Sequence, residues 1–340
     1  MTSNQRIKAF VNLKLHLSKE VQPLINIIQS SKHQNPWFTP ENVERALQAN
    51  INLLNSDDLI KWTDPYSKDF QEDNSKTVGL ILAGNIPMVG FHDVLACLIA
   101  GFSVQIKVSA DDKLLIPYLL NKLIEIEPHF SSKIAFVDRL SNFDLVIATG
   151  SNNSSRYFEY YFKNIPHIIR KNRNAVALIS GDEIENDLKN LGHDLFDYFG
   201  LGCRNVSKIY FPEGYNYSKF FEAIEYFSSI SNHYKYHNNY EYNKAIYLIN
   251  RDKHLDNGFL LLKEDKRIAS PLGVAYFEEY NNVKEVEKTL QEERELIQCI
   301  VSKTEIKGSA PIVNFGRTQM PGLNDYADGV NILDFLKSHK

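Results

Sequence analysis

Cysteine is scarce in this sequence, and positive charge is not in excess. The three cysteines, Cys97, Cys203 and Cys299, are too few and too odd in number for a disulfide framework, so a reducing compartment is expected. The formal net charge of −4 shows no excess of basic residues of the kind that binds nucleic acid. No group of histidines and cysteines has metal-ligand spacing, so no metal site is predicted.

The N-terminal residues lack the apolar segment of a signal peptide. They are Met-Thr-Ser-Asn-Gln-Arg, and we expect a cytoplasmic protein. One apolar run, residues 78–108, is long enough to span a bilayer, but it contains Asn85, His92 and Asp93. A charged residue in the middle of hydrocarbon is costly. A buried strand–turn–helix–strand unit therefore explains the run better than a membrane span.

The order of local patterns predicts parallel sheets. Apolar positions recur at helical spacing in 7–17 and 43–54, with Thr39 and Pro40 as a helix start, and the polar segment 63–76 resembles a linker. Short apolar runs then alternate with helical segments, which favours parallel strands with right-handed crossovers. The predicted strands are 77–83, 103–108, 133–137, 144–149, 168–170, 175–179, 207–211, 245–250, 258–263, 272–280 and 297–301. The predicted helices are 89–100, 113–126, 151–162, 182–199 (with Asp182 as N-cap), 217–229 and 283–295.

Cys203 is the first candidate for chemistry. It lies in Gly-Leu-Gly-Cys-Arg, residues 200–204, between a predicted helix and a predicted strand. Glycines let a backbone turn tightly and approach a ligand, and the neighbouring arginine would favour a thiolate. The spacing alone also fits a buried structural cysteine. Cys97 and Cys299 lie within apolar runs and are predicted to be buried.

Asn85 is the second candidate, because it follows the predicted strand 77–83. Ligands of open parallel sheets bind at the carboxyl ends of the strands. The Asn85 amide could donate to an oxyanion there. Capping of the next helix is the alternative role. The tyrosine-rich segment 210–250 likewise fits either packed aromatics or a surface for substrate or partner.

Several segments, taken in order, resemble the aldehyde dehydrogenase superfamily. They are Gly84-Asn-Ile-Pro87, Ala100-Gly101 with a strand ending at Lys107, Ala148-Thr-Gly-Ser151, Arg170-Lys-Asn-Arg-Asn-Ala-Val176 and Gly200–Lys208. The chain looks most like the acyl-CoA reductase family typified by the reductase subunit of bacterial bioluminescence, the LuxC family. Its more telling signatures here are Gly-Cys-Arg-Asn-Val-Ser-Lys and the tail Asp-Tyr-Ala-Asp-Gly-Val. The resemblance covers about residues 77–336, and the helical first 60 residues add little.

The resemblance implies an α/β, aldehyde dehydrogenase-like fold, with a Rossmann-type cofactor domain plus an α/β catalytic domain. The expected domains are residues 1–170, with N-terminal helices and an NADP-binding domain, and residues 171–312, with the nucleophilic cysteine. Residues 313–340 would return to the cofactor domain or form an oligomer flap. A homo-oligomer is expected.

The resemblance also implies catalytic roles. Cys203 matches the acylated nucleophile, and Asn85 matches the amide that forms an oxyanion hole with the Cys203 N–H. His92 lies close to Asn85 in the sequence and is the histidine we would test as a proton donor. The alternative for His92 is a surface or satisfied core residue.

The cofactor residues implied by the resemblance follow two strands. Lys107 matches the lysine that binds the adenosine ribose, and Ser109 comes shortly after it. The turn Thr149-Gly150-Ser151 matches the one that leads a helix toward the cofactor phosphates, which suits the anion preference of a helix N-terminus.

Two departures from the superfamily pattern refine the prediction. Hydrolytic members carry a glutamate base at a distance before the cysteine that falls here on Ile169 and Arg170, so an acyl-enzyme would persist until hydride arrives. Glu183 is an acid nearby in sequence, for which a solvated helix start is the favoured interpretation.

The second departure concerns the cofactor. NAD-selective members carry a glutamate three residues after the strand-ending lysine, where this chain has Ala110. The absence of this glutamate leaves room for a 2′-phosphate and favours NADPH. Asp111 and Asp112 weaken that preference if the register slips.

The sequence therefore predicts an NADPH-dependent reductase that converts a long-chain fatty acyl thioester, such as acyl-CoA, to the aldehyde through an S-acyl intermediate on Cys203. Alternatives are a short-chain CoA-acylating aldehyde dehydrogenase, an acyl phosphate reductase, and a non-catalytic scaffold of a fatty acid reductase complex. The bioluminescence relatives imply an acyl-protein synthetase as a partner.

Overall fold

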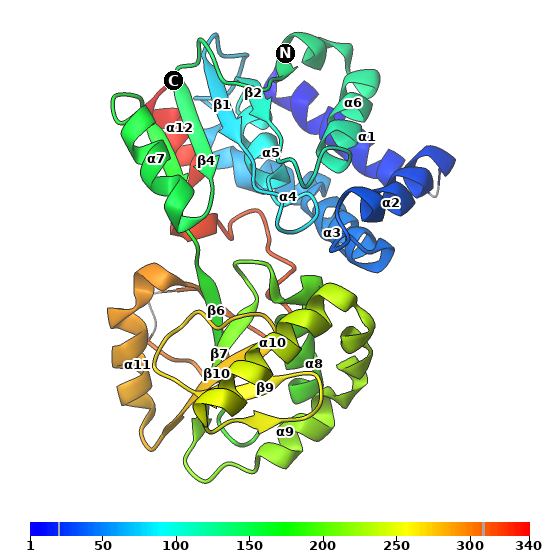
Figure 1. Ribbon diagram of the computed structural model, residues 1–340. Coiled ribbons are helices and arrows are strands. Elements are labelled where there is room, and N and C mark those ends of the chain that lie inside the picture. The colour runs from blue at the N-terminus through cyan, green and yellow to red at the C-terminus, as the bar shows by residue number, and fades with distance from the viewer. Residues whose placement is uncertain (20, 308–309) are drawn as a thin grey trace. The chain divides into compact units, whose positions relative to one another are not determined.

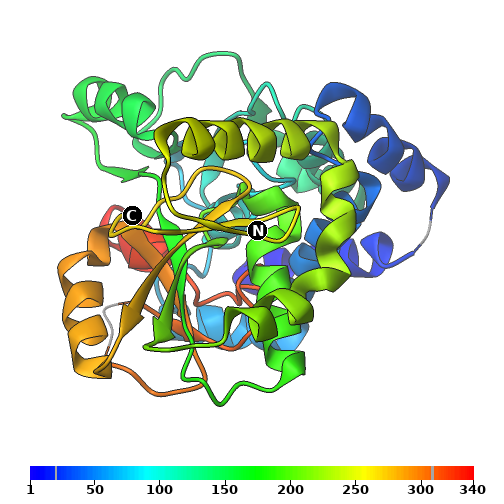
Figure 2. The same cartoon turned by 60° about the horizontal axis from the view of Figure 1, so that its bottom comes forward.

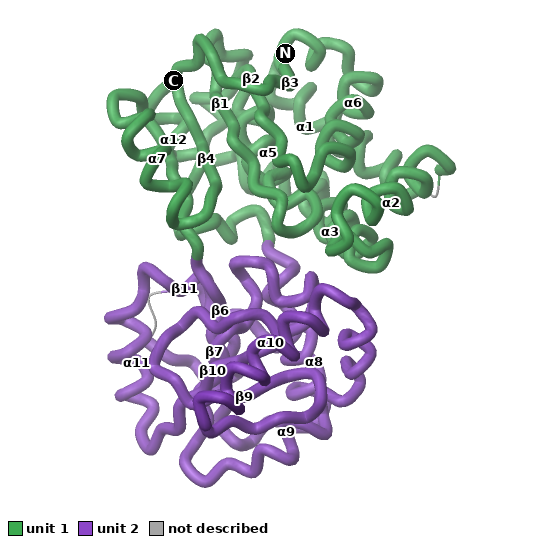
Figure 3. Tube along the Cα trace, in the orientation of Figure 1, with its two compact units in different colours: residues 1–172, 322–340 green, residues 173–321 purple. Residues whose placement is uncertain are grey.

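The computed structural model describes residues 1–19, 21–307 and 310–340, which form two compact units (Figure 3). Unit 1 comprises residues 1–172 and 322–340, and unit 2 comprises residues 173–321. The sequence predicts domain boundaries after residues 170 and 312, whereas the two units divide after residues 172 and 321. The assignment of cofactor binding to the first domain and catalysis to the second stays a prediction.

Unit 1 contains a sheet of five parallel strands in the order β3-β2-β1-β4-β5 (Figure 1). The strands are β1 (Thr77–Ile81), β2 (Ser103–Lys107), β3 (Ile134–Phe136), β4 (Leu145–Thr149) and β5 (His167–Arg170). Because all five are parallel, their carboxyl ends share one edge. The strand order reverses between β1 and β4, and such a switch point is where open α/β sheets bind ligands.

Helices surround this sheet, and α3 begins as predicted. The Oγ1 of Thr39 accepts from the Asn42 N–H at 3.4 Å, and Pro40 occupies the first turn, where a missing N–H costs little. The apolar run 78–108 folds into β1, α5 (Phe91–Ile99) and β2, and no helix of the described residues is long and apolar enough to cross a membrane. The helices of unit 1 are α1 (Ser3–Leu17), α2 (Gln22–Gln34), α3 (Pro40–Leu53), α4 (Ser56–Thr63), α5 (Phe91–Ile99), α6 (Leu115–Ile126), α7 (Asn152–Phe162), α12 (Ile332–Ser338), and the 3₁₀ turns η1 (Asp64–Tyr66), η2 (Pro128–Ser132) and η6 (Ala327–Gly329).

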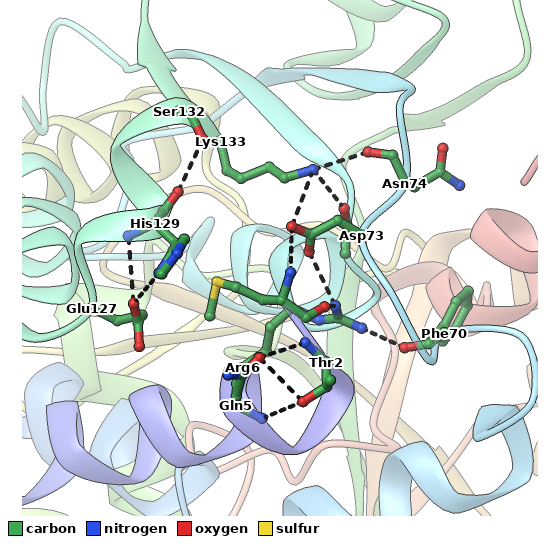
Figure 4. Close-up of polar contacts among 12 residues, drawn as sticks. Thr2, Gln5, Arg6, Phe70, Asp73, Asn74, Glu127, His129, Ser132 and Lys133 are labelled. Carbon is green, nitrogen blue, oxygen red and sulfur yellow. Dashed lines mark hydrogen bonds and ion pairs between the residues drawn. The ribbon is translucent and has the colours of Figure 1, made fainter.

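The segment before β1 packs into unit 1, so the linker interpretation of residues 63–76 is wrong. Phe70 is buried, and its carbonyl accepts from the guanidinium of buried Arg6 on α1. Arg6 also donates to Asp73 at 3.1 Å, and Asp73 pairs with the N-terminal amino group at 2.8 Å (Figure 4). These contacts fix α1 against the segment that leads into β1.

Unit 2 contains a seven-stranded sheet in the order β12-β11-β6-β7-β10-β9-β8, in which only the β8–β9 pair is antiparallel within the described chain. Its core includes Leu290 of α11 (Val283–Glu292), which packs with Val176 and Ile300. The strands are β6 (Asn174–Leu178), β7 (Val206–Pro212), β8 (Leu255–Asp256), β9 (Leu261–Glu264), β10 (Val274–Tyr280), β11 (Ile297–Val301) and β12 (Ile312–Val313). The helices are α8 (Glu185–Phe196), α9 (Tyr217–Ile224), α10 (Tyr234–Asn250), α11 (Val283–Glu292), and the 3₁₀ turns η3 (Asp197–Gly200), η4 (Glu225–Asn232) and η5 (Arg294–Leu296).

The strand predicted at residues 245–250 is wrong, because this segment is the end of α10, the long helix of unit 2 (Figure 2). Its aromatic and β-branched residues suit a strand locally. However, Tyr236, Tyr240, Asn243 and Tyr247 recur at helical spacing and are buried. Tyr240 and Tyr247 pack against β9 and β10, so this part of the tyrosine-rich segment is core.

The predicted start and end of α8 are also wrong. Asp182 does not cap the helix, which begins after Ile184 and ends at Phe196 instead of residue 199. Glu183 is buried instead of solvated, and its carboxylate accepts from the N–H groups of Ser180 and Gly181 at 2.8 and 2.9 Å. Glu183 therefore closes the turn that precedes α8.

Candidate active site

Three of the predicted segments lie at the carboxyl edge of the sheet in unit 1. Asn85 is exposed and follows β1, exposed Lys107 is the last residue of β2, and half-buried Thr149 is the last residue of β4. Because β1 lies between β2 and β4, these segments surround the switch point of the sheet. The fold thus brings together residues that are far apart in the sequence.

The segment after Lys107 is held by a buried carboxylate. Asp112 accepts from the Leu115 N–H at 3.1 Å, at the start of α6, and from the Met88 N–H at 2.8 Å. Met88 has a positive φ of 56°, which is costly for a residue other than glycine, so this bond helps to hold the Asn85 segment in shape. Burial raises the pKa of Asp112. Asp112 is thus committed to backbone donors.

Ser109 lies between β2 and this carboxylate. Its Oγ accepts from the Asp111 N–H at 3.2 Å, which shapes the turn after β2. Ala110 and Asp111 are exposed at the same turn. Of the two acids that could replace the missing glutamate, only Asp111 therefore has an exposed side chain.

The turn after β4 leads directly into α7. Ser151 is the N-cap, and its Oγ accepts from the Ser154 N–H at 3.2 Å. A Cβ on Gly150 would lie 2.9 Å from both Ser154 Cβ and the Phe158 ring, so a larger residue would push against the first turns of α7. The N-terminus of an 11-residue helix is thereby placed beside Thr149, where its partial positive charge favours anions.

His92, on α5, joins this helix to the C-terminal segment of unit 1. Its Nε2 lies 2.9 Å from the Leu323 carbonyl, which can only accept, so this nitrogen carries the proton. The ring centroid lies 5.5 Å from that of Trp62 and 5.9 Å from that of Tyr326. The proton-donor role of His92 stays a prediction.

Cys203 belongs to unit 2 and follows a strained segment of backbone. Tyr198, Phe199 and Gly200 have consecutive positive φ angles of 54°, 59° and 80°. For the two aromatic residues this conformation costs of order 1–3 kcal/mol each, and such strain is concentrated at functional sites. The half-buried Cys203 then lies within a turn in which the Asn205 N–H donates to the Gly202 carbonyl at 3.0 Å.

Asn205 fixes this turn, a role that the sequence analysis missed. Its Oδ1 accepts from the Gly202 N–H at 2.8 Å, so the turn is closed from both sides of Cys203. Its Nδ2 donates to the carbonyls of Asp194 and Asp197 at 3.0 and 2.9 Å. The only sequence signal was its place two residues after the cysteine.

Asp194, whose carbonyl binds Asn205, also binds residues 316–318, which are distant in the sequence. This α8 residue is 1% exposed, and its carboxylate accepts from the N–H groups of Gly316 at 2.6 Å and Thr318 at 3.0 Å. Burial raises the pKa of Asp194 to about 6, against the opposing effect of these donors. A single aspartate in a helix gives no sequence signal for this role.

The other two cysteines are buried, as predicted. Burial raises the pKa of Cys299 to about 12, although Arg204 beside it opposes the shift. Burial likewise raises the pKa of Cys97 well above its ordinary value. Both are neutral thiols of the inert, structural kind. Among the described residues no three of His, Cys, Asp and Glu gather as a metal site.

A sequence profile of the family described as acyl-CoA reductase (LuxC) matches residues 6–211, more than half of the chain. The chain belongs to the acyl-CoA reductase (LuxC) family. The match to the LuxC family begins in α1, so it extends the resemblance over the N-terminal helices, and it includes Cys203 and Asn205. No curated protein sequence matches the chain.

Solved structures place this LuxC-family chain in the aldehyde dehydrogenase fold. Aldehyde dehydrogenase 21 from Physcomitrella patens, in complex with succinate, is 12% identical with a TM-score of 0.70, covering 100% of this chain and 84% of that one. The Mycobacterium tuberculosis aldehyde dehydrogenase complexed with NAD⁺ is 13% identical with a TM-score of 0.67, covering 93% and 78%. The predicted fold class is confirmed. Family and fold together support an oxidoreductase of the acyl-CoA reductase or aldehyde dehydrogenase type.

Proposed function

We propose that this LuxC-family protein reduces a long-chain fatty acyl thioester to the aldehyde with NADPH, through an S-acyl intermediate on Cys203. The observation that carries the proposal is the turn around Cys203. A half-buried thiol follows a strained backbone segment and lies in a turn that Asn205 closes at both ends. In a family of acyl-CoA reductases, such a turn is suited to hold a cysteine nucleophile in position.

The first step forms a bond between Cys203 Sγ and the thioester carbonyl carbon. The carbonyl electron pair moves to oxygen, and its return expels the substrate's thiolate, which takes up a proton to become the free thiol. The Cys203 N–H and the Asn85 amide are proposed to donate to that oxyanion. Donors aimed at a developing charge stabilise the transition state more than the ground state.

Reduction completes the cycle. The hydride that the acyl carbon needs would be supplied by a reduced nicotinamide when it is bound. Breakage of the carbon–sulfur bond then releases the aldehyde and returns Cys203 to its thiolate. At the sequence distance where hydrolytic relatives carry a glutamate base, Arg170 is engaged in a buried ion pair with Asp93 at 2.7 Å. A guanidinium cannot activate water, so the S-acyl group would persist until reduction.

The carboxyl edge of unit 1 fits a dinucleotide. Lys107 is exposed there, Ser109 and Thr149 present hydroxyls, and Gly150 and Ser151 place the α7 N-terminus beside them. These residues would hold the ribose and the phosphates. The related Mycobacterium tuberculosis structure contains NAD⁺, which supports a nicotinamide cofactor. The preference for NADPH rests on exposed Ala110 and on the engagement of Asp112 by backbone donors.

The partners and location follow from family resemblance. We propose a cytoplasmic homo-oligomer that receives acyl groups from acyl-CoA or from an acyl-protein synthetase. His92 is proposed as the proton donor. To act in this way, its Nε2–H would have to leave the Leu323 carbonyl.

Mass spectrometry of the protein incubated with palmitoyl-CoA, without NADPH, tests the chemistry. We expect one acyl adduct on Cys203, no adduct in Cys203→Ala, and release of the aldehyde when NADPH is added. Cys299→Ala is the matched control and should keep the adduct, because Cys299 is buried with a raised pKa. Absence of an adduct in the wild type, or its persistence in Cys203→Ala, would refute the proposal.

A further inference from the structure

A buried side-chain amide close to the Cys203 turn lacks a hydrogen-bond partner. Gln319 is only 8% exposed, and its Nε2 finds no acceptor among the described residues. Buried N–H groups are almost always paired in folded proteins, because an unpaired donor has lost its hydration without compensation. An unpaired donor at this place can bind an acceptor that arrives with a ligand.

The amide lies against the residue that precedes Cys203. A Cβ built on Gly202 would be 3.5 Å from both the Nε2 and the Oε1 of Gln319. The Gly202 N–H already donates to Asn205 Oδ1 at 2.8 Å. It is therefore not available to the amide oxygen of Gln319. Because Gly202 has no side chain, the Gln319 amide can lie beside the turn that contains Cys203.

The amide and the turn share one support. Gln319 directly follows Thr318, whose N–H donates to the Asp194 carboxylate at 3.0 Å. The carbonyl of the same Asp194 accepts from Asn205, which closes the Cys203 turn. The backbone that carries Gln319 and the turn that contains Cys203 are therefore both held by α8 and its end. A donor carried on a fixed backbone stabilises developing charge with little reorganisation.

We infer that Gln319 is a further oxyanion donor, whose Nε2–H binds the carbonyl oxygen of the acyl group on Cys203. This inference rests on the proposed S-acyl chemistry. The acyl carbonyl is the acceptor that arrives next to Gly202 when Cys203 is acylated, and its oxygen gains charge in each tetrahedral state. Gln319 acts in addition to Asn85 and the Cys203 N–H, and it forms no covalent bond.

Gln319→Met tests the inference, because it removes the donor and keeps a side chain of similar volume. Two reactions of Cys203 are compared: acylation by palmitoyl-CoA, and alkylation by iodoacetamide, which forms no oxyanion. We expect acylation to slow by about 10²–10³, as for loss of one oxyanion donor, while alkylation changes by less than about twofold. Gln319→Glu should be acylated at least as slowly as Gln319→Met. Gln291→Met, on the exposed face of α11, is the control and should match the wild type in both reactions.

Three outcomes would overturn the inference. Unchanged acylation in Gln319→Met would show that the amide does not contact the reacting group. An equal fall in both rates would mean that Gln319 only holds the turn in shape. A shifted pH midpoint of alkylation would mean that the amide binds the thiolate instead. Failure of the proposed function is distinct, since the wild type itself would then gain no acyl group on Cys203.

Discussion

Arg170 and Asp93 form a buried ion pair, with Arg170 Nη1 2.7 Å from Asp93 Oδ2. The pair joins the last residue of β5 to the first turn of α5, the helix that follows the Asn85 segment. The remaining atoms, Nε and Nη2 of Arg170 and Oδ1 of Asp93, have no other partner in the described part of the chain. Each charge therefore depends on the other.

Removal of the arginine alone should be strongly destabilising. Arg170→Met leaves a buried carboxylate without its cation, and we expect a loss of about 3–5 kcal/mol in the free energy of unfolding, measured in urea. The double variant Asp93→Leu, Arg170→Met should recover much of this loss, because neither charge is then buried alone. A double variant as unstable as the single one would contradict this account.

Asn205→Ala should loosen the turn that holds Cys203. The Gly202 N–H and the carbonyls of Asp194 and Asp197 would lose their partner. We expect the free energy of unfolding to fall by about 1–3 kcal/mol, and the rate of Cys203 alkylation to change with it. Asn281→Ala, at an exposed position before α11, is the control. Wild-type stability in Asn205→Ala would show that the turn is held by other contacts.

Asn85→Ala tests the proposed oxyanion hole. Asn85 is exposed, so its removal should leave the fold intact. We expect acylation of Cys203 by palmitoyl-CoA to slow by about 10²–10³, with no change in alkylation by iodoacetamide. An unchanged acylation rate would remove Asn85 from the mechanism.

The stability of the protein should depend on pH through Asp194. Burial raises its folded pKa from 3.8 to about 6, so between these values the folded chain keeps a proton that the unfolded chain has released. Stability from this group is therefore present below the unfolded pKa and is lost as pH rises through the folded one. Two pH units correspond to roughly 3 kcal/mol.

Asp194→Asn isolates this effect, because asparagine does not ionise. The difference in unfolding free energy between wild type and Asp194→Asn should move by roughly 2.5 kcal/mol against the wild type between pH 4 and pH 7. Urea titrations of both proteins at several pH values measure it. Parallel pH profiles would mean that Asp194 is ionised in the folded protein with an ordinary pKa.

Ala110→Glu should shift the cofactor preference from NADPH toward NADH. A carboxylate at this exposed position would repel a 2′-phosphate, by roughly 1–4 kcal/mol at contact distance, and would accept from a ribose hydroxyl. We expect the ratio of kcat/KM for the two cofactors to change by about tenfold or more. Ala269→Glu, which adds the same charge at an exposed position of unit 2, should leave the ratio unchanged. A wild type that already prefers NADH would refute the proposed preference.

Local patterns in the sequence determined the parallel core, and the family resemblance made Cys203 the candidate nucleophile. A strand buried on both faces is a short apolar run, and helix starts such as Thr39-Pro40 are set by neighbouring residues. Asn85 was found because it follows a strand, whereas Lys107 and Ser151 were implied by the resemblance to the family. The helix at residues 245–250 was missed because β propensity was weighed there, although the spacing of its buried tyrosines was helical.

Only the tertiary structure decided what supports the turn that contains Cys203. Asp194 meets Gly316 and Thr318 across more than a hundred residues, and Gln319 lies against Gly202 across a similar distance. Such contacts are set by the packing of whole elements, and they leave no periodic or local signal in the sequence. The burial of Asp194, which shifts its pKa, and the unpaired donor of Gln319 are likewise properties of the folded chain, since both depend on the removal of water.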